Sequence, residues 1–129
     1  MNQLNCLIVE GNIAKDPETL KTANGSDVSK FPIAINRFYK DKDGNTQKEV
    51  VYFEIEAWDN LSKLLNKENW KKGDEIRIVG RMKQNQWKDS TGKSHSSVSI
   101  IAEHINLIKP ARTVKKAPKS KDDDYGMGR

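Results

Sequence analysis

Hydrophobic and polar residues alternate along much of this chain, which is the pattern of half-buried β-strands. In the sequence IRIVGRMKQNQWK at 76–88, the isoleucines share one face with Gly80 and Met82, whereas basic residues and Trp87 fall on the other. The second face is therefore cationic and ends in a large aromatic side chain. Alternating or apolar runs of this kind predict strands over 4–14, 31–39, 50–58, 75–82 and 96–108.

Turn signals and one short helix separate these runs. Asn-Gly at 24–25 and Asp-Gly at 43–44 favour turns, the second of them within a hairpin. After the third strand, Asp59 can cap a short helix whose leucines have helical spacing, and Lys-Lys-Gly at 71–73 closes it. Three strands, a short helix and two strands match a small Greek-key barrel. The sequence therefore predicts an all-β protein, a five-stranded Greek-key OB-fold barrel with one short helix.

The composition changes after Lys109-Pro110. From there the chain consists mostly of Lys, Pro, Asp, Ser and Gly, with almost nothing to bury. Such a segment cannot offset the entropy of ordering by burying apolar surface. We expect residues 1–109 to form one domain and residues 110–129 to be a disordered charged tail.

The net charge of the chain indicates which class of partner it can bind. The 129 residues carry 23 Lys and Arg against 18 Asp and Glu, a formal net charge of +5. A basic balance favours polyanions such as nucleic acid or an acidic membrane surface. Residues 1–109 have 17 basic and 15 acidic residues, so a polyanion site there depends on local clustering. The densest positive segment is 71–93, with seven basic and three acidic residues.

Enzymatic and metal-binding motifs are weak. Gly92-Lys93-Ser94 resembles the end of a P-loop, but that motif needs a glycine where Trp87 stands and a helix afterwards. His95 and His104, with the single distant Cys6, do not have zinc-ligand spacing, and we interpret His104 as a structural side chain. We expect no enzyme, no cofactor and no metal site. One cysteine and the lack of a signal-type or membrane-spanning segment favour a reducing, cytoplasmic location.

Aromatic residues set among basic ones carry the functional interpretation. Tyr52 and Trp58 share the outward parity of their strand, as Trp87 does on its own. Unpaired bases stack on such rings for roughly 1–3 kcal/mol each, while Lys and Arg follow the phosphates. The alternatives are a protein–protein interface or packing under the hairpins. Glu54 and Glu56 share the outward parity and should repel phosphate, so this strand contacts bases more than backbone, or lies at a subunit contact.

Several short motifs stand in a specific order along the chain. They are VEGNI at 9–13, DPE at 16–18, NG at 24–25, YKDK at 39–42, KGD at 72–74, VGR at 79–81 and WKDSTGK at 87–93. In this order and spacing the chain resembles, from Asn5 to Ile108, the bacterial and phage single-stranded DNA-binding proteins that build homotetramers from OB folds. The resemblance implies sequence-independent binding and protection of single-stranded DNA during replication, recombination and repair, in a bacterial cytoplasm or, for a phage protein, in that of the host.

The resemblance also implies which residues bind DNA. One of the implied stacking residues, Tyr39, lies on the core side by strict alternation, so it requires a bulge or strong bend, and Phe38 is its rival. We interpret the remaining tryptophan, Trp70, as packing. The predicted site comprises Tyr39, Tyr52, Trp58 and Trp87 for stacking, with Arg37, Lys40, Arg77, Arg81, Lys83 and Lys88 for phosphate.

Two further expectations concern assembly and partners. The first strand is apolar on both faces, with Leu7 and Val9 on one and Cys6 and Ile8 on the other, which favours a homo-oligomer, tetrameric by resemblance. Family members usually end in an acidic, hydrophobic tip that docks onto replication and repair proteins. Here the acidic triplet Asp122, Asp123 and Asp124 is present without the apolar residues. The alternatives are an OB-fold protein-interaction module, such as a primosome accessory protein, or a single-stranded RNA binder.

Overall fold

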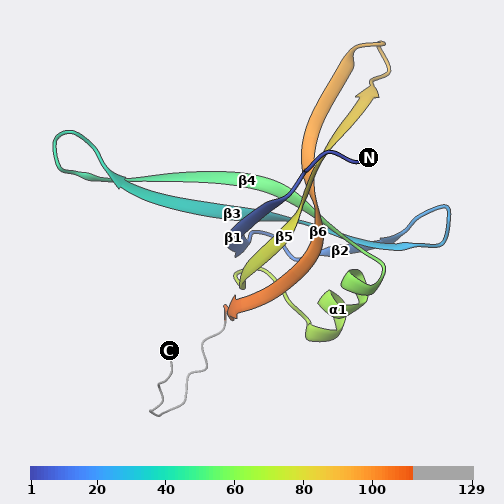
Figure 1. The fold of residues 1–129 in the computed structure, drawn as a ribbon, viewed down its shortest axis with the longest axis horizontal. Helices are drawn as coiled ribbons and strands as arrows, with labels where there is room; N and C mark the ends of the chain where they lie inside the picture. Colours follow the sequence, from blue (N-terminus) through green and yellow to red (C-terminus); the bar gives the residue numbers. More distant parts are fainter. Residues whose placement is uncertain (112–129) are drawn as a thin grey trace.

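The structure, a computed structural model that describes residues 1–111, is an all-β barrel with one short helix (Figure 1). The predicted fold class is confirmed, and each predicted strand is present, most of them longer than expected. A four-residue strand that the sequence pattern did not predict precedes the second of them. The elements are β1 Leu7–Ile13, β2 Glu18–Lys21, β3 Asp27–Lys40, β4 Thr46–Trp58, α1 Asn60–Glu68, β5 Glu75–Lys88 and β6 Ser94–Lys109.

One sheet closes on itself to form the barrel. Its strand order is β1-β5-β6-β4-β3-β2, and β1 also pairs with β3 at Asn12 and Ile13. All pairs are antiparallel except the short parallel pair between β4 and β6. Two glycines permit the close approach that closure needs. A Cβ on Gly11 would lie 2.6 Å from the Ala34 carbonyl oxygen, and one on Gly80 would lie 2.2 Å from that of Ile101.

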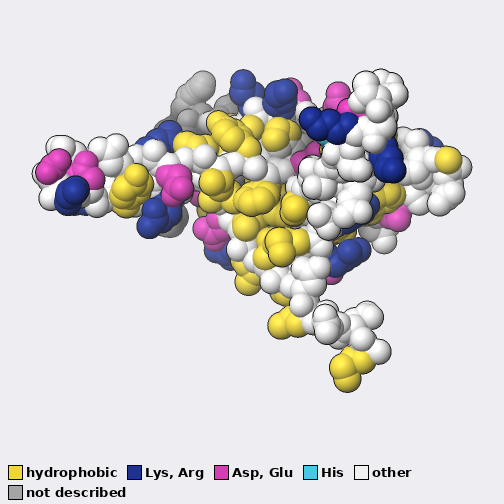
Figure 2. All heavy atoms as spheres, turned by 90° about the horizontal axis from the view of Figure 1, so that it is seen from above, with side chains coloured by type: hydrophobic (Ala, Val, Ile, Leu, Met, Phe, Trp, Pro, Cys, Tyr) yellow, Lys and Arg dark blue, Asp and Glu magenta, His cyan; other side chains and the backbone are white. Residues whose placement is uncertain are grey.

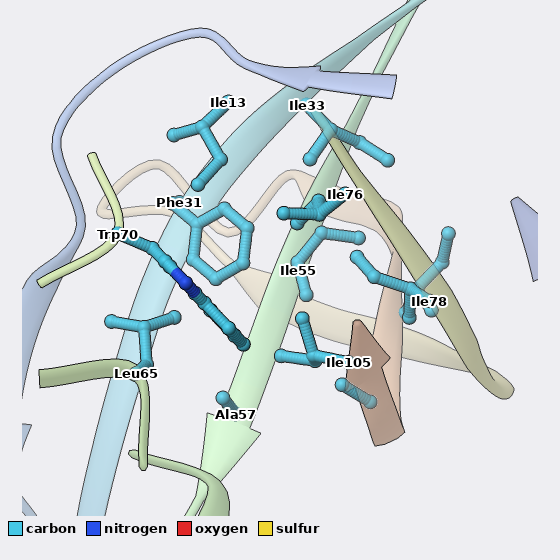
Figure 3. Packing of buried hydrophobic residues seen from close by; sticks show 12 residues of the cluster. Ile13, Phe31, Ile33, Ile55, Ala57, Leu65, Trp70, Ile76, Ile78 and Ile105 are labelled. Atoms are coloured by element: carbon cyan, nitrogen blue, oxygen red, sulfur yellow. The ribbon is translucent and has the colours of Figure 1, made fainter. Parts of the chain in front are cut away.

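The core fills the inside of the barrel and the space beneath α1. It is built from the inward positions of the strands, together with Leu65 of the helix and Trp70 after it (Figure 3). Trp70 is buried, so its interpretation as packing is confirmed. Fully buried members of the core include Phe31, Ile33, Ile55, Ile76 and Ile78.

The helix begins where expected but by a different mechanism. Asp59 precedes it with φ 52° and ψ −112°, and its carboxylate makes no capping hydrogen bond. A side-chain N-cap typically has an extended backbone, which Asp59 lacks at this φ, and its N–H donates to the Asp27 carbonyl at 2.8 Å. The expected end at 71–73 is also wrong, because Asn69 in the left-handed conformation ends the helix after Glu68.

Two long hairpins leave the barrel, and Figure 1 shows them projecting in different directions. They are the outer halves of β3–β4 and β5–β6. Alternating burial in β3 ends by Asn36, and in β5 it ends at Gly80. Beyond these points nearly every residue is exposed. Met82, predicted to share the inward face, is therefore exposed because the strand has left the barrel.

The described part of the chain stops at residue 111, so the expected disorder of the tail and the acidic triplet at 122–124 lie outside it, apart from residues 110 and 111. Within residues 1–111, no helix has the length and apolar character needed to cross a membrane.

Candidate nucleic-acid interface

Strand register places most of the predicted stacking rings on one outer face. In β4, Tyr52 and Trp58 point away from the core, and Tyr52 is 65% exposed. In β5, Trp87 is 50% exposed, on the parity of Lys83. Ser99 of β6 pairs with Lys83 on one side and with Glu54 on the other, so the outward faces of β4, β6 and β5 are continuous.

The β3–β4 hairpin carries two candidate rings on opposite faces. The pairing of β3 with β4 runs without interruption from Val28–Trp58 to Lys40–Thr46. The register therefore contains no bulge of the kind expected to turn Tyr39 outward. Phe38 lies on the face of Tyr52, and Tyr39 lies on the other face with the Arg37 guanidinium 5.2 Å from its ring centroid. Both rings are exposed because this part of the hairpin has no core side. A base can therefore reach Phe38 from the side of Tyr52 and Tyr39 from the opposite side.

Most of the predicted phosphate contacts are already paired with carboxylates. In three of the pairs both side chains are at least half-exposed or nearly so, so each pair contributes little to stability and can exchange for a phosphate. In the fourth, Lys83 is half-exposed but its partner Glu56 is buried. Within residues 1–111, Lys40 and Lys88 have no ion-pair partner within 4.0 Å. The pairs are Arg37 with Glu49 at 3.3 Å, Arg77 with Glu10 at 2.6 Å, Arg81 with Glu103 at 3.8 Å and Lys83 with Glu56 at 3.9 Å.

Trp87 has a partner that sequence reasoning missed. The imidazole of His95 stacks on the indole, with ring centroids 5.5 Å apart and planes 19° from parallel. His95 Nε2 is 2.8 Å from the Asp89 carboxylate, and Trp87 and His95 line a hollow of about 490 Å³ at the end of the β5–β6 hairpin. The signal was present in the sequence, because a hairpin whose tip is 89–93 places Trp87 opposite His95.

Asp89 organises the tip of this hairpin. Its Oδ1 accepts hydrogen bonds from the Thr91 hydroxyl at 2.6 Å and from the Thr91 and Lys93 backbone N–H groups at 2.9 Å. The Thr91 hydroxyl, followed by His95 and the Lys93 N–H, lowers the pKa of Asp89 from 3.8 to about 2. The carboxylate is thus ionised at neutral pH and holds the turn that carries the Trp87–His95 stack.

The two glutamates predicted to repel phosphate differ in the structure. Glu54 is exposed, as expected, whereas Glu56 is buried despite its outward parity. The Glu56 carboxylate accepts a hydrogen bond from Trp58 Nε1 at 3.0 Å and one from the Ser99 hydroxyl at 3.2 Å. The expected repulsion of phosphate stays a prediction, and at Glu56 two protein donors and Lys83 offset part of the negative charge.

The remaining polar residues add no second site. His104 is exposed on β6, so its interpretation as a structural side chain is wrong, since the register turns it outward beside Val79. Within residues 1–111, no cluster of His, Cys, Asp or Glu could hold a metal ion. A larger hollow of about 620 Å³ lies near Trp70 and Leu107, and none of the predicted binding residues line it.

The known proteins to which this chain is similar in sequence include single-stranded DNA-binding proteins. A model of the single-strand binding protein family matches residues 4–108. The chain is 31% identical over 105 residues to a single-stranded DNA-binding protein of Deinococcus radiodurans, covering 81% of this chain and 34% of that one. It is 30% identical over 128 residues to single-stranded DNA-binding protein 2 of Chlorobaculum tepidum, covering 98% and 82%. The chain thus spans about a third of the Deinococcus protein and most of the Chlorobaculum one.

Solved structures share the fold. A deletion mutant of the single-stranded DNA binding protein from Thermus aquaticus has a TM-score of 0.71 at 22% identity, covering 82% of this chain and 51% of that one. A Plasmodium falciparum single-stranded DNA-binding protein in complex with single-stranded DNA also has a TM-score of 0.71, at 20% identity, covering 84% and 97%.

Proposed function

Because this chain belongs to the single-strand binding protein family, we propose that it binds single-stranded DNA without sequence preference and protects it during replication, recombination and repair. One observation carries the proposal. Exposed Tyr52 and Trp87 share a continuous outer face of β4, β6 and β5 with half-buried Trp58 and the basic side chain of Lys83. Stacking on rings is blind to sequence because every base has an apolar face.

Binding on this face combines two processes. Bases stack on the exposed rings, and phosphates replace carboxylates as partners of the paired basic residues, for example Arg81 in its ion pair with Glu103. Because Lys40 and Lys88 have no such partner within residues 1–111, they attract phosphate without an exchange. The affinity should therefore fall with salt less steeply than the number of basic residues suggests.

Quenching of tryptophan fluorescence tests the proposal. Addition of oligo(dT) should quench the indoles of Trp58 and Trp87, whereas buried Trp70 should remain emissive. A Trp58→Phe, Trp87→Phe double variant keeps only Trp70 and should lose the quenching while still binding. Duplex DNA of equal length is the control that should not quench. Quenching of the double variant equal to that of the wild type, or none with the wild type, would refute the site.

The same titration separates the alternative functions. Oligo(U) that quenches as strongly as oligo(dT) at equal salt would make the chain a general single-strand binder that includes RNA. An OB-fold module that binds chiefly protein would give no quenching with either polymer. We expect the DNA polymer to bind more tightly.

We also propose that the chain forms a homotetramer through β1 and its neighbours. Residues 7–11 have strand partners only on the β5 side, so the other edge of β1 can pair with a second copy. Leu4 and Ile8 are exposed beside that edge, and Figure 2 shows hydrophobic side chains gathered in the middle of one face. Ile8→Glu should reduce the mass measured by light scattering at micromolar concentration. Leu20→Glu, exposed on β2, is the matched control that should not.

The acidic triplet at 122–124 supports one more proposal, docking of replication and repair proteins, by its charge alone. Replacing all three aspartates by asparagine should then weaken capture of such partners without changing the affinity for oligo(dT).

A further inference from the structure

On the proposed DNA-facing surface of residues 1–111, the carboxylate of Glu56 is buried. The Glu56 side chain is 6% exposed, although Glu54 and Tyr52 on the same face of β4 are exposed. A carboxylate taken out of water is costly unless donors or cations replace the water. The groups that do so identify its role.

Three strands supply those groups. Trp58 Nε1 of β4 donates to Glu56 Oε1 at 3.0 Å, and the Ser99 hydroxyl of β6 donates to Oε2 at 3.2 Å. The Lys83 ammonium of β5 lies 3.9 Å from Oε1. Asn85 extends the network by donating from Nδ2 to Ser99 Oγ at 3.1 Å. Two of these partners, Trp58 and Lys83, are residues assigned above to base stacking and phosphate binding.

We propose that Glu56 is a positioning residue of the DNA-binding surface, which fixes the indole of Trp58 and holds back the charge of Lys83. This inference rests on the proposed function. A residue two positions along a strand points to the same face, so the long indole of Trp58 can turn back toward Glu56 and be held by its N–H. A ring held in this way loses less side-chain freedom when a base stacks on it. The Lys83 ammonium, drawn toward the carboxylate, must leave it to contact a phosphate.

Two substitutions of Glu56 distinguish its contact with Trp58 from its effect on Lys83. In Glu56→Gln the amide oxygen can still accept the Trp58 N–H, but the charge that retains Lys83 is gone. In Glu56→Leu both are lost, while a side chain of similar volume keeps the site filled. Glu54→Gln is the matched control, since it removes the same charge from the same face of β4 at an exposed position.

The contact with Trp58 is read without DNA. In an amide and indole ¹H–¹⁵N spectrum, Trp58→Phe identifies the Trp58 indole signal. Glu56→Leu should shift that signal and speed its exchange with water, Glu56→Gln should preserve the slow exchange, and Glu54→Gln should leave the signal in place. An unmoved indole signal in a folded Glu56→Leu protein overturns the positioning role even if single-stranded DNA binding itself is normal.

The functional consequence is read by a double-mutant cycle with oligo(dT). With Lys83 replaced by Ala throughout, Glu56→Leu should weaken binding roughly 5-fold when Trp58 is present and have almost no effect in the Trp58→Ala background, because both changes then remove only the same stacking contribution. An equal loss in both backgrounds overturns the proposal. The Glu54→Gln effect should be the same in both backgrounds.

The salt dependence of oligo(dT) binding tests whether Glu56 holds back the charge of Lys83. Glu56→Gln should steepen the slope of log affinity against log salt by up to about 0.7, and Lys83→Ala added to it should remove that increment. If Glu56→Leu does not fold, Glu56→Gln still decides the matter, because an unmoved Trp58 indole signal or an unchanged slope would each overturn the assignment. Absence of oligo(dT) binding by the wild type would instead refute the proposed function, leaving the indole contact measurable.

Discussion

Within the single strand β4, residues 55–57 are buried, whereas residues 46–49 in the projecting hairpin are exposed. The same contrast holds along β3 and β5. In the barrel, each inward position is fixed by a core that tolerates little change. In the hairpins, the strand has no core side, so its side chains on both faces are available to a ligand. Stability thus depends on the inner face of the barrel half, whereas the proposed binding residues lie on its outer face and along both hairpins.

The largest expected effect comes from the barrel half of β4. Ile55 is fully buried, and Ile55→Ala should lower the free energy of unfolding by about 2–5 kcal/mol, because truncation removes contacts and leaves a cavity. Val51 has the same parity in the same strand but is largely exposed, so Val51→Ala should cost less than about 1 kcal/mol. Urea unfolding measures both. A loss at Val51 as large as that at Ile55 would show that a second molecule covers the hairpin.

The next effect belongs to the hairpin and should appear in binding. Trp87→Ala should weaken single-stranded DNA binding by roughly 1–3 kcal/mol per site and leave the melting temperature almost unchanged, because the indole packs on partly exposed His95 rather than on the core. A fluorescence titration and a thermal melt on the same preparation check this. Unfolding of the variant with unchanged affinity per folded molecule would make Trp87 structural.

A smaller effect distinguishes paired from unpaired basic residues. Lys88→Ala in the hairpin should reduce the slope of log affinity against log salt by about 0.7, the contribution of one phosphate contact to a single strand. Arg81→Ala on the barrel wall should reduce it by less, because the ion pair with Glu103 already offsets part of its charge. A salt titration of both variants with oligo(dT) measures the difference. Equal slopes for the two would show that the ion pair breaks fully on binding.

The smallest effect is local to the β5–β6 tip and depends on pH. In the folded protein the pKa of Asp89 is lowered from 3.8 to about 2. The stabilisation of the turn by the ionised carboxylate is therefore complete above pH 4 and is lost as the pH falls toward 2. The protection factors of the Thr91 and Lys93 backbone N–H groups, taken relative to their intrinsic exchange rates, should therefore fall in that window before the barrel opens. Asp89→Asn should show the faster exchange already at neutral pH. Protection at the tip that persists to pH 2 would contradict this assignment of the turn.

The contrast between barrel and hairpin also explains what sequence patterns could predict. Alternation located the core of β3, β4 and β5 because burial is what produces alternation. It missed β2, whose four residues are all exposed, and it misassigned Met82, which continues the parity of a strand that has left the barrel. The family resemblance is confirmed by the match over residues 4–108, whereas the individual binding residues stay predictions.

The roles of Glu56 and His95 could not be predicted from one strand at a time. Parity places Glu56 outward, and only Ser99 and Lys83 from two other strands bury it. His95 gains its role from its position across the hairpin from Trp87. Both depend on which strands are neighbours, information that periodicity within a segment does not contain.

The way in which the sheet closes has a consequence for the order of folding. The β3–β4 and β5–β6 hairpins join neighbouring segments, whereas closure depends on Asn12 and Ile13 with β3, and on residues 54–56 with β6. Joining distant segments costs more loop entropy than zipping a hairpin. We expect both hairpins to acquire protected amides first and the β4–β6 pair last, in pulsed hydrogen exchange during refolding. The surfaces that bind DNA would then form before the barrel that supports them is complete.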